Sequence, residues 1–281
     1  MSIHFLKNNM RQYGGAAKRL HIVVLLTIIL LLPSAGKSQE YVRTDFKSKS
    51  YVDTMARMVW TGVNMSGQIP VGALRETFKA NLSVGTGVTY KTQTNWTFDV
   101  NFNYMFGSNL RDTTYSFLGS MINDDGIVYD GNGMKATLYT EGRYWYVGAG
   151  LGKIIPVDRW KNSGIWLHLG AGYFGHKIRI NDYDHQVPQL DGDYLKGYDH
   201  RSSGFAMNQF IGYLFMQKNR VLSFYGGIEI FETWTKPDRN YIFNVGPTEN
   251  MPYKFSGLIS LKIGWVIPLY EKKETTTFYY R

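Results

Sequence analysis

Residues 94–107 read TNWTFDVNFNYMFG and alternate large apolar side chains with small or polar ones. An alternation of period two puts each set on its own face of a β-strand. The apolar set is Trp96, Phe98, Val100, Phe102, Tyr104 and Phe106, and the opposite set is Thr97, Asp99, Asn101, Asn103 and Gly107. The stretch therefore predicts a strand with one apolar and one polar face.

The same pattern recurs along the chain. Residues 79–91 and 253–270 repeat it clearly, and five further candidates bring the expected number of strands to eight. These five are 57–67, which is the weakest, 137–151, 164–180, 205–217 and 221–234. A composition with 21 Tyr, 16 Phe, 7 Trp, 30 Gly and only 8 Pro also favours strands over helices. The sequence predicts an all-β protein.

The connections between these strands alternate in length. Residues 92–93 and 218–220 are tight turns, whereas 108–136, 181–204 and 235–252 are long, and 68–78 and 152–163 are moderate. With the N-terminus periplasmic, every long connection lies outside, as in outer-membrane barrels. We therefore expect an antiparallel up-and-down transmembrane β-barrel of about eight strands.

A soluble lipocalin-like barrel would show the same alternation, so the volume of the lumen has to decide between the two. An eight-stranded barrel has room inside for small side chains or one small ligand. Six or seven large side chains per strand would overfill it, which predicts that the aromatic faces contact lipid. Tyr and Trp near strand ends fit girdles at the two membrane surfaces. The expected girdle residues are Tyr90, Trp96, Trp265, Leu269 and Tyr270 at the periplasmic rim, and Tyr104 and Phe106 at the external rim.

The N-terminus has the features of an export signal. A basic segment precedes the apolar run from residue 22 to residue 32, which is too short to span a bilayer, although an N-terminal anchor is the alternative. The expected organisation is a cleaved signal peptide at 1–38, a periplasmic segment at 39–55, the barrel at 56–270 and a periplasmic tail at 271–281. Cleavage removes five cations and lowers the net charge from +9 to +4. These dispersed cations exclude a nucleic-acid partner, and the absence of Cys excludes disulfides and lipoprotein acylation.

Charged side chains are expected to form a network in the lumen. By strand parity we assign Glu141 and Arg143 to one inward face, and Lys79, Asp99, Glu229 and Lys262 to the inward faces of other strands. Buried charges are tolerated when they are paired. We interpret the six as a structural plug, with an ion or proton path as the alternative.

The connection at 181–200, NDYDHQVPQLDGDYLKGYDH, is the densest polar segment. Its Asp and His residues are Asp182, Asp184, His185, Asp191, Asp193, Asp199 and His200. They could bind calcium or activate water, but their spacing matches no defined site and also suits turns. Residues 123–133, NDDGIVYDGNG, precede a strand rather than a helix, which argues against a phosphate loop. His168 is expected to be a satisfied lumen residue. We expect no catalytic residue, no metal site and no cofactor.

The terminal segment YKFSGLISLKIGWVIPLY, residues 253–270, resembles the last strand of outer-membrane β-barrels. Lys262, Gly264, Ile267 and Leu269 match the spacing of the signal that the barrel assembly machinery recognises. The mature chain resembles a small uncharacterised barrel of the Bacteroidota, within the outer membrane protein A and X type superfamily. That resemblance is architectural, covers about residues 56–270 and transfers no functional residue.

These features predict a non-enzymatic barrel in the outer membrane of a Gram-negative envelope, acting as a membrane-anchored scaffold or as a subunit of an envelope complex. The expected partners are outer-membrane lipid and lipopolysaccharide, the assembly machinery and other envelope proteins. Two alternatives stay open: a hydrolase, protease or lipid-modifying, that uses the connection at 181–204, and a narrow porin.

Overall fold

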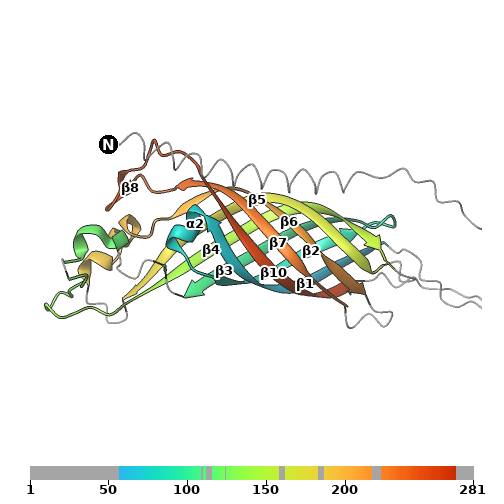
Figure 1. Ribbon diagram of the computed structural model, residues 1–281, viewed down its shortest axis with the longest axis horizontal. Coiled ribbons are helices and arrows are strands. Elements are labelled where there is room, and N and C mark those ends of the chain that lie inside the picture. Colours follow the sequence, from blue (N-terminus) through green and yellow to red (C-terminus); the bar gives the residue numbers. More distant parts are fainter. Residues whose placement is uncertain are drawn as a thin grey trace, which may run out of the picture. The chain divides into compact units, whose positions relative to one another are not determined.

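A computed structural model describes residues 57–108, 110–111, 116–123, 125–157, 162–182, 187–216 and 223–269. Within them, eight long antiparallel strands close into one barrel in the order β1-β10-β7-β6-β5-β4-β3-β2 (Figure 1). The strands are β1 (Met58–Gly72), β2 (Asn81–Lys91), β3 (Trp96–Ser108), β4 (Leu138–Pro156), β5 (Gly164–Asp182), β6 (Ser202–Met216), β7 (Ser223–Pro237) and β10 (Lys254–Leu269). The predicted all-β barrel of eight strands is confirmed. The expected signal peptide, periplasmic segment and tail lie outside the described residues.

The weakest expected strand is a full member of the barrel. β1 pairs with β2 on one side and closes the ring against β10 on the other. It is five residues longer at its C-terminal end than the alternation at 57–67 indicated, since it ends at Gly72. The pairing of β10 with β1 includes Pro268, which lies opposite Trp60.

A short turn joins β2 to β3 at one end of the barrel, which is called the periplasmic end after the predicted orientation, and larger connections lie at the other, which is called the external end. Between β2 and β3 the chain turns over residues 92–95, where Thr92 Oγ1 accepts a hydrogen bond from the Trp96 amide at 3.0 Å. The opposite end carries α2 (Ala73–Thr77), η1 (Ser116–Met121), η2 (Pro188–Leu190), η3 (Tyr194–Gly197) and the small sheet of β8 (Tyr241–Ile242) and β9 (Gly246–Pro247). Among the described residues, no helix is long and apolar enough to cross a membrane.

The outer wall is apolar, as the alternation predicted. Val100 is 61% exposed on β3, and Leu261 is 71% exposed on β10. Aromatic rings form a band on the outer wall, where Trp145 lies 5.4 Å from Tyr173, between ring centroids, at the middle of β4 and β5. Phe205 lies 6.0 Å from Trp234 near the external ends of the shorter strands β6 and β7. Near the periplasmic ends, Phe224 stacks on Trp265 at 6.5 Å. Such girdles on an exposed apolar wall match the two surfaces of a bilayer. One polar pair shares the outward parity of this wall but is buried, where Gln209 Nε2 donates to Glu232 Oε1 at 2.8 Å.

The interior differs from the small, polar lumen that the sequence suggested. A buried apolar cluster fills the external half, and its barrel members include Met105, Tyr144, Tyr146, Phe174, Phe231 and Leu258. A second cluster closes the periplasmic end, with Trp60, Ile154, Trp166, Phe210, Leu214 and Val266 among its members. Polar side chains gather between the two clusters. The lumen is therefore packed with large side chains on some strands and small ones on others.

Glycines provide the space for these large rings. A Cβ at Gly148 would collide with the hydroxyl of Tyr146, and one at Gly264 would collide with the ring of Tyr225. Close packing leaves no room for such an atom without a shift of the ring. Gly264 thus has a packing role in the lumen.

Candidate functional site: the polar lumen and the external cap

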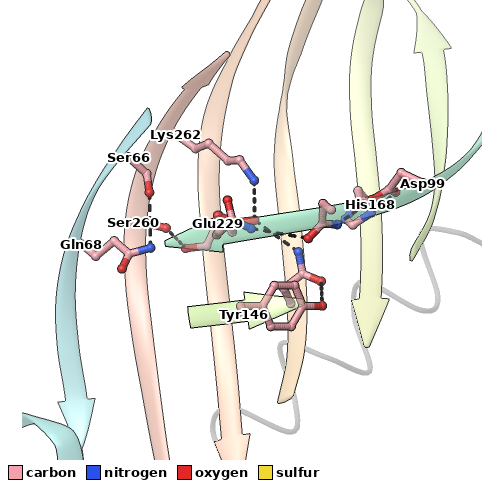
Figure 2. A network of polar contacts seen from close by, with 11 residues as sticks. Ser66, Gln68, Asp99, Tyr146, His168, Glu229, Ser260 and Lys262 are labelled. Carbon is pink, nitrogen blue, oxygen red and sulfur yellow. Dashed lines mark hydrogen bonds and ion pairs between the residues drawn. The ribbon is translucent and has the colours of Figure 1, made fainter. Parts of the chain in front are cut away.

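A hydrogen-bonded ion pair lies at the centre of the barrel. Lys262 Nζ on β10 is 2.8 Å from Glu229 Oε1 on β7, and their side chains are 10% and 2% exposed (Figure 2). Asn208 Nδ2 on β6 donates to the same carboxylate oxygen at 3.2 Å, and Tyr146 on β4 donates its hydroxyl to Asn208 Oδ1 at 3.1 Å. Four strands are thereby connected through one buried carboxylate.

A second buried pair faces this network from the neighbouring wall. His168 Nε2 on β5 lies 2.6 Å from Asp99 Oδ1 on β3, and Asn101 donates to the other oxygen of that carboxylate at 2.6 Å. Figure 2 shows both pairs pointing into the same interior space. His168 is a satisfied lumen residue, as expected.

The two pairs line a small cavity. Its volume is about 50 Å³, and its wall includes Asp99, His168, Glu229 and Lys262. Trp60, Trp166, Phe210, Tyr225 and Val266 also contribute to the wall and belong to or pack against the periplasmic apolar cluster. A space of this size holds a few waters at most. The geometry stabilises charges inside the barrel and offers no wide aqueous path.

Three of the six residues assigned to the lumen network lie elsewhere. Tyr144 and Tyr146 are buried inside the barrel, so Glu141 and Arg143, which have the opposite parity on β4, face outward. They form an ion pair with each other on the outer wall. Lys79 is exposed in the segment before β2. The assignment of Glu141, Arg143 and Lys79 to the lumen is wrong, because β4 carries aromatic residues on both faces and Lys79 lies outside the paired strand.

The proposed assembly-signal residues lie on the strand that closes the barrel. Lys262 and Gly264 face the lumen, where the first pairs with Glu229 and the second accommodates Tyr225. Ile267 and Leu269 are exposed on the outer wall. Recognition of these residues by the assembly machinery stays a prediction.

The external connections fold into a cap with a core of its own, which is continuous with the apolar cluster in the barrel. Its buried residues include Phe117, Leu118, Val128, Val187, Leu190 and Tyr198. Tyr198 packs on Phe243 with ring centroids 4.7 Å apart. Arg239 Nη2 lies 2.6 Å from Asp199 Oδ2, which ties the connection before β8 to the one before β6. The cap is thus held by non-local packing.

The acidic residues of the cap serve its backbone and its ion pairs. Asp182 Oδ2 accepts from the Val187 amide at 2.9 Å, Asp191 Oδ1 accepts from the Gly192 amide at 2.8 Å, and Asp193 pairs with Lys196 at 2.5 Å. In the 123–133 segment, Asp130 Oδ1 accepts from the amides of Asn132 and Met134. The side chains of Asp130, Asp182 and Asp191 thus bond nearby backbone amides, as the turn interpretation expects, whereas that of Asp193 pairs with Lys196. Asp184 and His185 lie outside the described residues, and the described part of the chain holds no group of three or more metal-ligating side chains.

His200 occupies an enclosed position in the cap. Burial lowers the pKa of its imidazole, and the ring of Phe117 meets it edge-on at 6.3 Å. The backbone at His200 has a φ of 45°, in the left-handed region. A neutral ring packed in this way has a structural role.

The sequence reasoning missed a set of exposed large side chains on the cap. They are Tyr129, Met134, Tyr194, Tyr241, Phe243 and Val245, and Tyr194 is the most exposed tyrosine among them at 66%. Their positions beyond the aromatic band place them outside the hydrocarbon layer. They lie in connections without periodic patterning, which explains why alternation did not reveal them.

Comparisons with known proteins find similar folds and no relative in sequence. No family model and no curated protein matches this chain. Among solved structures, Ail, the attachment invasion locus protein of Yersinia pestis, has 10% sequence identity and a TM-score of 0.43 over 75% of this chain and 99% of that one. Neisserial surface protein A has 10% sequence identity and a TM-score of 0.39 over 74% of this chain and 96% of that one. The outer membrane protein AlkL has 12% sequence identity and a TM-score of 0.35 over 83% of this chain and 100% of that one.

The architecture of the chain itself accounts for its location. A closed barrel leaves no unpaired strand edge, and its exposed wall is apolar between two aromatic bands. Such a wall is stable in lipid, and barrels of this kind occur in outer membranes. The chain is a β-barrel of the outer membrane.

Proposed function

We propose that this barrel is a non-enzymatic, membrane-anchored scaffold whose external cap binds another component of a Gram-negative envelope or surface. The observation that carries the proposal is the group of large side chains exposed on a folded cap. Exposed aromatic residues outside the lipid band are typical of protein interaction sites. Tyr129, Tyr194 and Tyr241 come from three separate connections of the cap, and each is exposed.

The packing of the lumen and of the cap favours this proposal over the two alternatives, a narrow porin and a hydrolase. Transport through a porin needs an open path, and apolar clusters fill this barrel on both sides of its polar centre. A hydrolase that uses the connection at 181–204 needs an accessible histidine beside an acid, whereas among the described residues of that connection His200 packs against Phe117 and Asp199 is paired with Arg239. Both observations favour a protein that acts through its external surface.

Replacing Tyr129, Tyr194 and Tyr241 together by Ser should weaken binding of the envelope component to the cap and leave the barrel folded. Buried aromatic residues dominate the binding energy of interfaces, so the triple variant should lose at least about tenfold in affinity. The measurement is quantitative co-purification with envelope proteins after mild detergent extraction, with heat-dependent gel migration as the test of folding.

The matched control is Gln189→Ser with Glu249→Ser, which changes two exposed polar residues of the same cap. It should retain the co-purifying proteins that the triple variant loses. Equal recovery of the same proteins with all three forms of the barrel would refute a role for the exposed aromatic surface.

A further inference from the structure

A row of directly paired residues crosses the outer wall obliquely from β10 to β5. Its successive members, each opposite the next across a ladder, are Leu261, Gly67, Leu82, Phe106, Arg143 and Lys177. Leu261 lies midway along β10 between the aromatic residues Phe255 and Trp265, within the lipid band. Arg143 and Lys177 lie beyond Trp145 and Tyr173, at the external surface. The row therefore rises from the hydrocarbon layer to the headgroup level.

The lower part of this row is a groove. A Cβ added at Gly67 would meet no atom within 4 Å, so the wall is hollow at this position. The hollow belongs to a depression of about 710 Å³ whose lining includes Ile69, Leu82, Phe106 and Leu261 and, at the external end, both Glu141 and Arg143. Its surface is apolar along the lipid band and becomes charged at the external end.

The upper end of the row concentrates positive charge. Arg143 lies directly opposite Lys177, and Arg179 lies directly opposite Glu141, all on the outward face. Like charges placed opposite each other destabilise a sheet. Glu141 pairs with Arg143, and the Nε of Arg143 is buried without a hydrogen-bond partner among the described residues. The four side chains leave a net charge of +2, which an anion at this position would neutralise.

The dimensions of the row suit a lipid. Strands of such barrels are about 4.8 Å apart and tilted by roughly 40°, so five steps along the row rise roughly 15 Å. That is about half of the 30 Å hydrocarbon core, the depth that one leaflet occupies. An acyl chain in the groove would therefore place its headgroup at the cationic end.

From this row we infer a binding site for a phosphorylated acyl glycolipid of the external leaflet, of the lipid A class. One acyl chain lies along Leu261, Gly67, Leu82 and Phe106. A headgroup phosphate contacts Arg143, Lys177 and Arg179. The inference requires the barrel to lie in an outer membrane and does not depend on the cap binding a partner.

The first test removes the charge. The purified mature barrel in detergent is titrated with bisphosphorylated lipid A and with its dephosphorylated form, and bound lipid is counted by native mass spectrometry. Lys177→Gln with Arg179→Gln should weaken binding of bisphosphorylated lipid A about tenfold to thirtyfold, the contribution of two cations at a membrane surface. Dephosphorylated lipid A should bind the unaltered barrel more weakly by a similar factor. The charge-matched control, Arg75→Gln with Lys236→Gln, alters two other external cations and should bind as the unaltered barrel does.

The second test fills the groove. Gly67→Leu adds a side chain where space is open, so the fold should be retained while lipid A binding weakens at least about tenfold. Ala171→Leu places the same side chain at an exposed outward position of β5 and should leave binding unchanged. The inference is overturned if the control variants weaken binding as much as the test variants do. It is also overturned if dephosphorylated lipid A binds equally well, or if inorganic phosphate displaces lipid A at equal concentration, since that would indicate a simple anion site.

Discussion

Glu229→Ala should destabilise the barrel by about 3–5 kcal/mol, the cost of leaving one member of a buried ion pair without its partner. In the variant, Lys262 would keep its charge inside the lumen, where its side chain is only 10% exposed. Asn208 would also lose the acceptor for its Nδ2 hydrogen bond. Equilibrium unfolding in urea, with the barrel in lipid vesicles, measures the change in free energy.

The double variant Glu229→Leu with Lys262→Met tests the cause of that loss. It removes both charges and replaces them by apolar side chains, which is often nearly neutral for a buried pair. We expect the double variant to be more stable than Glu229→Ala alone. The single variants Glu229→Leu and Lys262→Met complete the cycle. If their changes in unfolding free energy add in the double variant, the pair is not coupled and the interpretation of the polar lumen is wrong.

Val100→Arg should cost about 2–4 kcal/mol, because it places a cation on the lipid face near the middle of the membrane. Val100 is outward and lies midway on β3 between Trp96 and Tyr104. An arginine there has no water and no partner within the apolar band. The same urea titration measures the effect.

Ser108→Arg is the matched control for depth. Ser108 shares the strand and the outward face of Val100, but it lies at the external end, beyond Phe106. The penalty for a cation falls to about 0–1 kcal/mol near the interface. Equal penalties at the two positions would mean that the wall of β3 does not cross a membrane.

The strands that alternate cleanly could be placed from sequence, together with their faces. In residues 94–107 every large side chain except Met105 has the same parity, and the structure exposes Phe98, Val100, Phe102 and Tyr104 on the outer wall. Period two fixes the face as soon as one side is apolar throughout. The same reasoning located Asp99, Glu229 and Lys262 inside the barrel.

On β4 the same reasoning could not work, because that strand has large side chains on both faces. Tyr144 and Tyr146 point inward while Trp145 and Val147 point outward, so parity could not be read from hydrophobicity. The inward tyrosines fit because glycines such as Gly148 leave space beside them. That compensation depends on which residues meet across the lumen, which the local pattern does not contain.

The fold of the cap was also beyond the sequence pattern. Its core joins Phe117 of one connection to Val187 and Tyr198 of another, and Arg239 reaches Asp199 across 40 positions. Turn chemistry could be recognised in the Asp-rich and Gly-rich segments. The contacts between these segments are non-local, and no periodic sequence pattern predicts them.

The most direct test of the membrane-embedded barrel is a side-chain NMR measurement on β3 in a bilayer nanodisc. A lipid with a nitroxide on its acyl chain broadens signals from nearby protons, so it reports which side chains of residues 96–108 contact the hydrocarbon. The structure predicts strong broadening for Phe98, Val100 and Phe102, and protection for Asn101 and Asn103, which lie inside. Broadening of Asn101 and Asn103 with protection of Val100, or no broadening at any residue of the strand, would contradict the account.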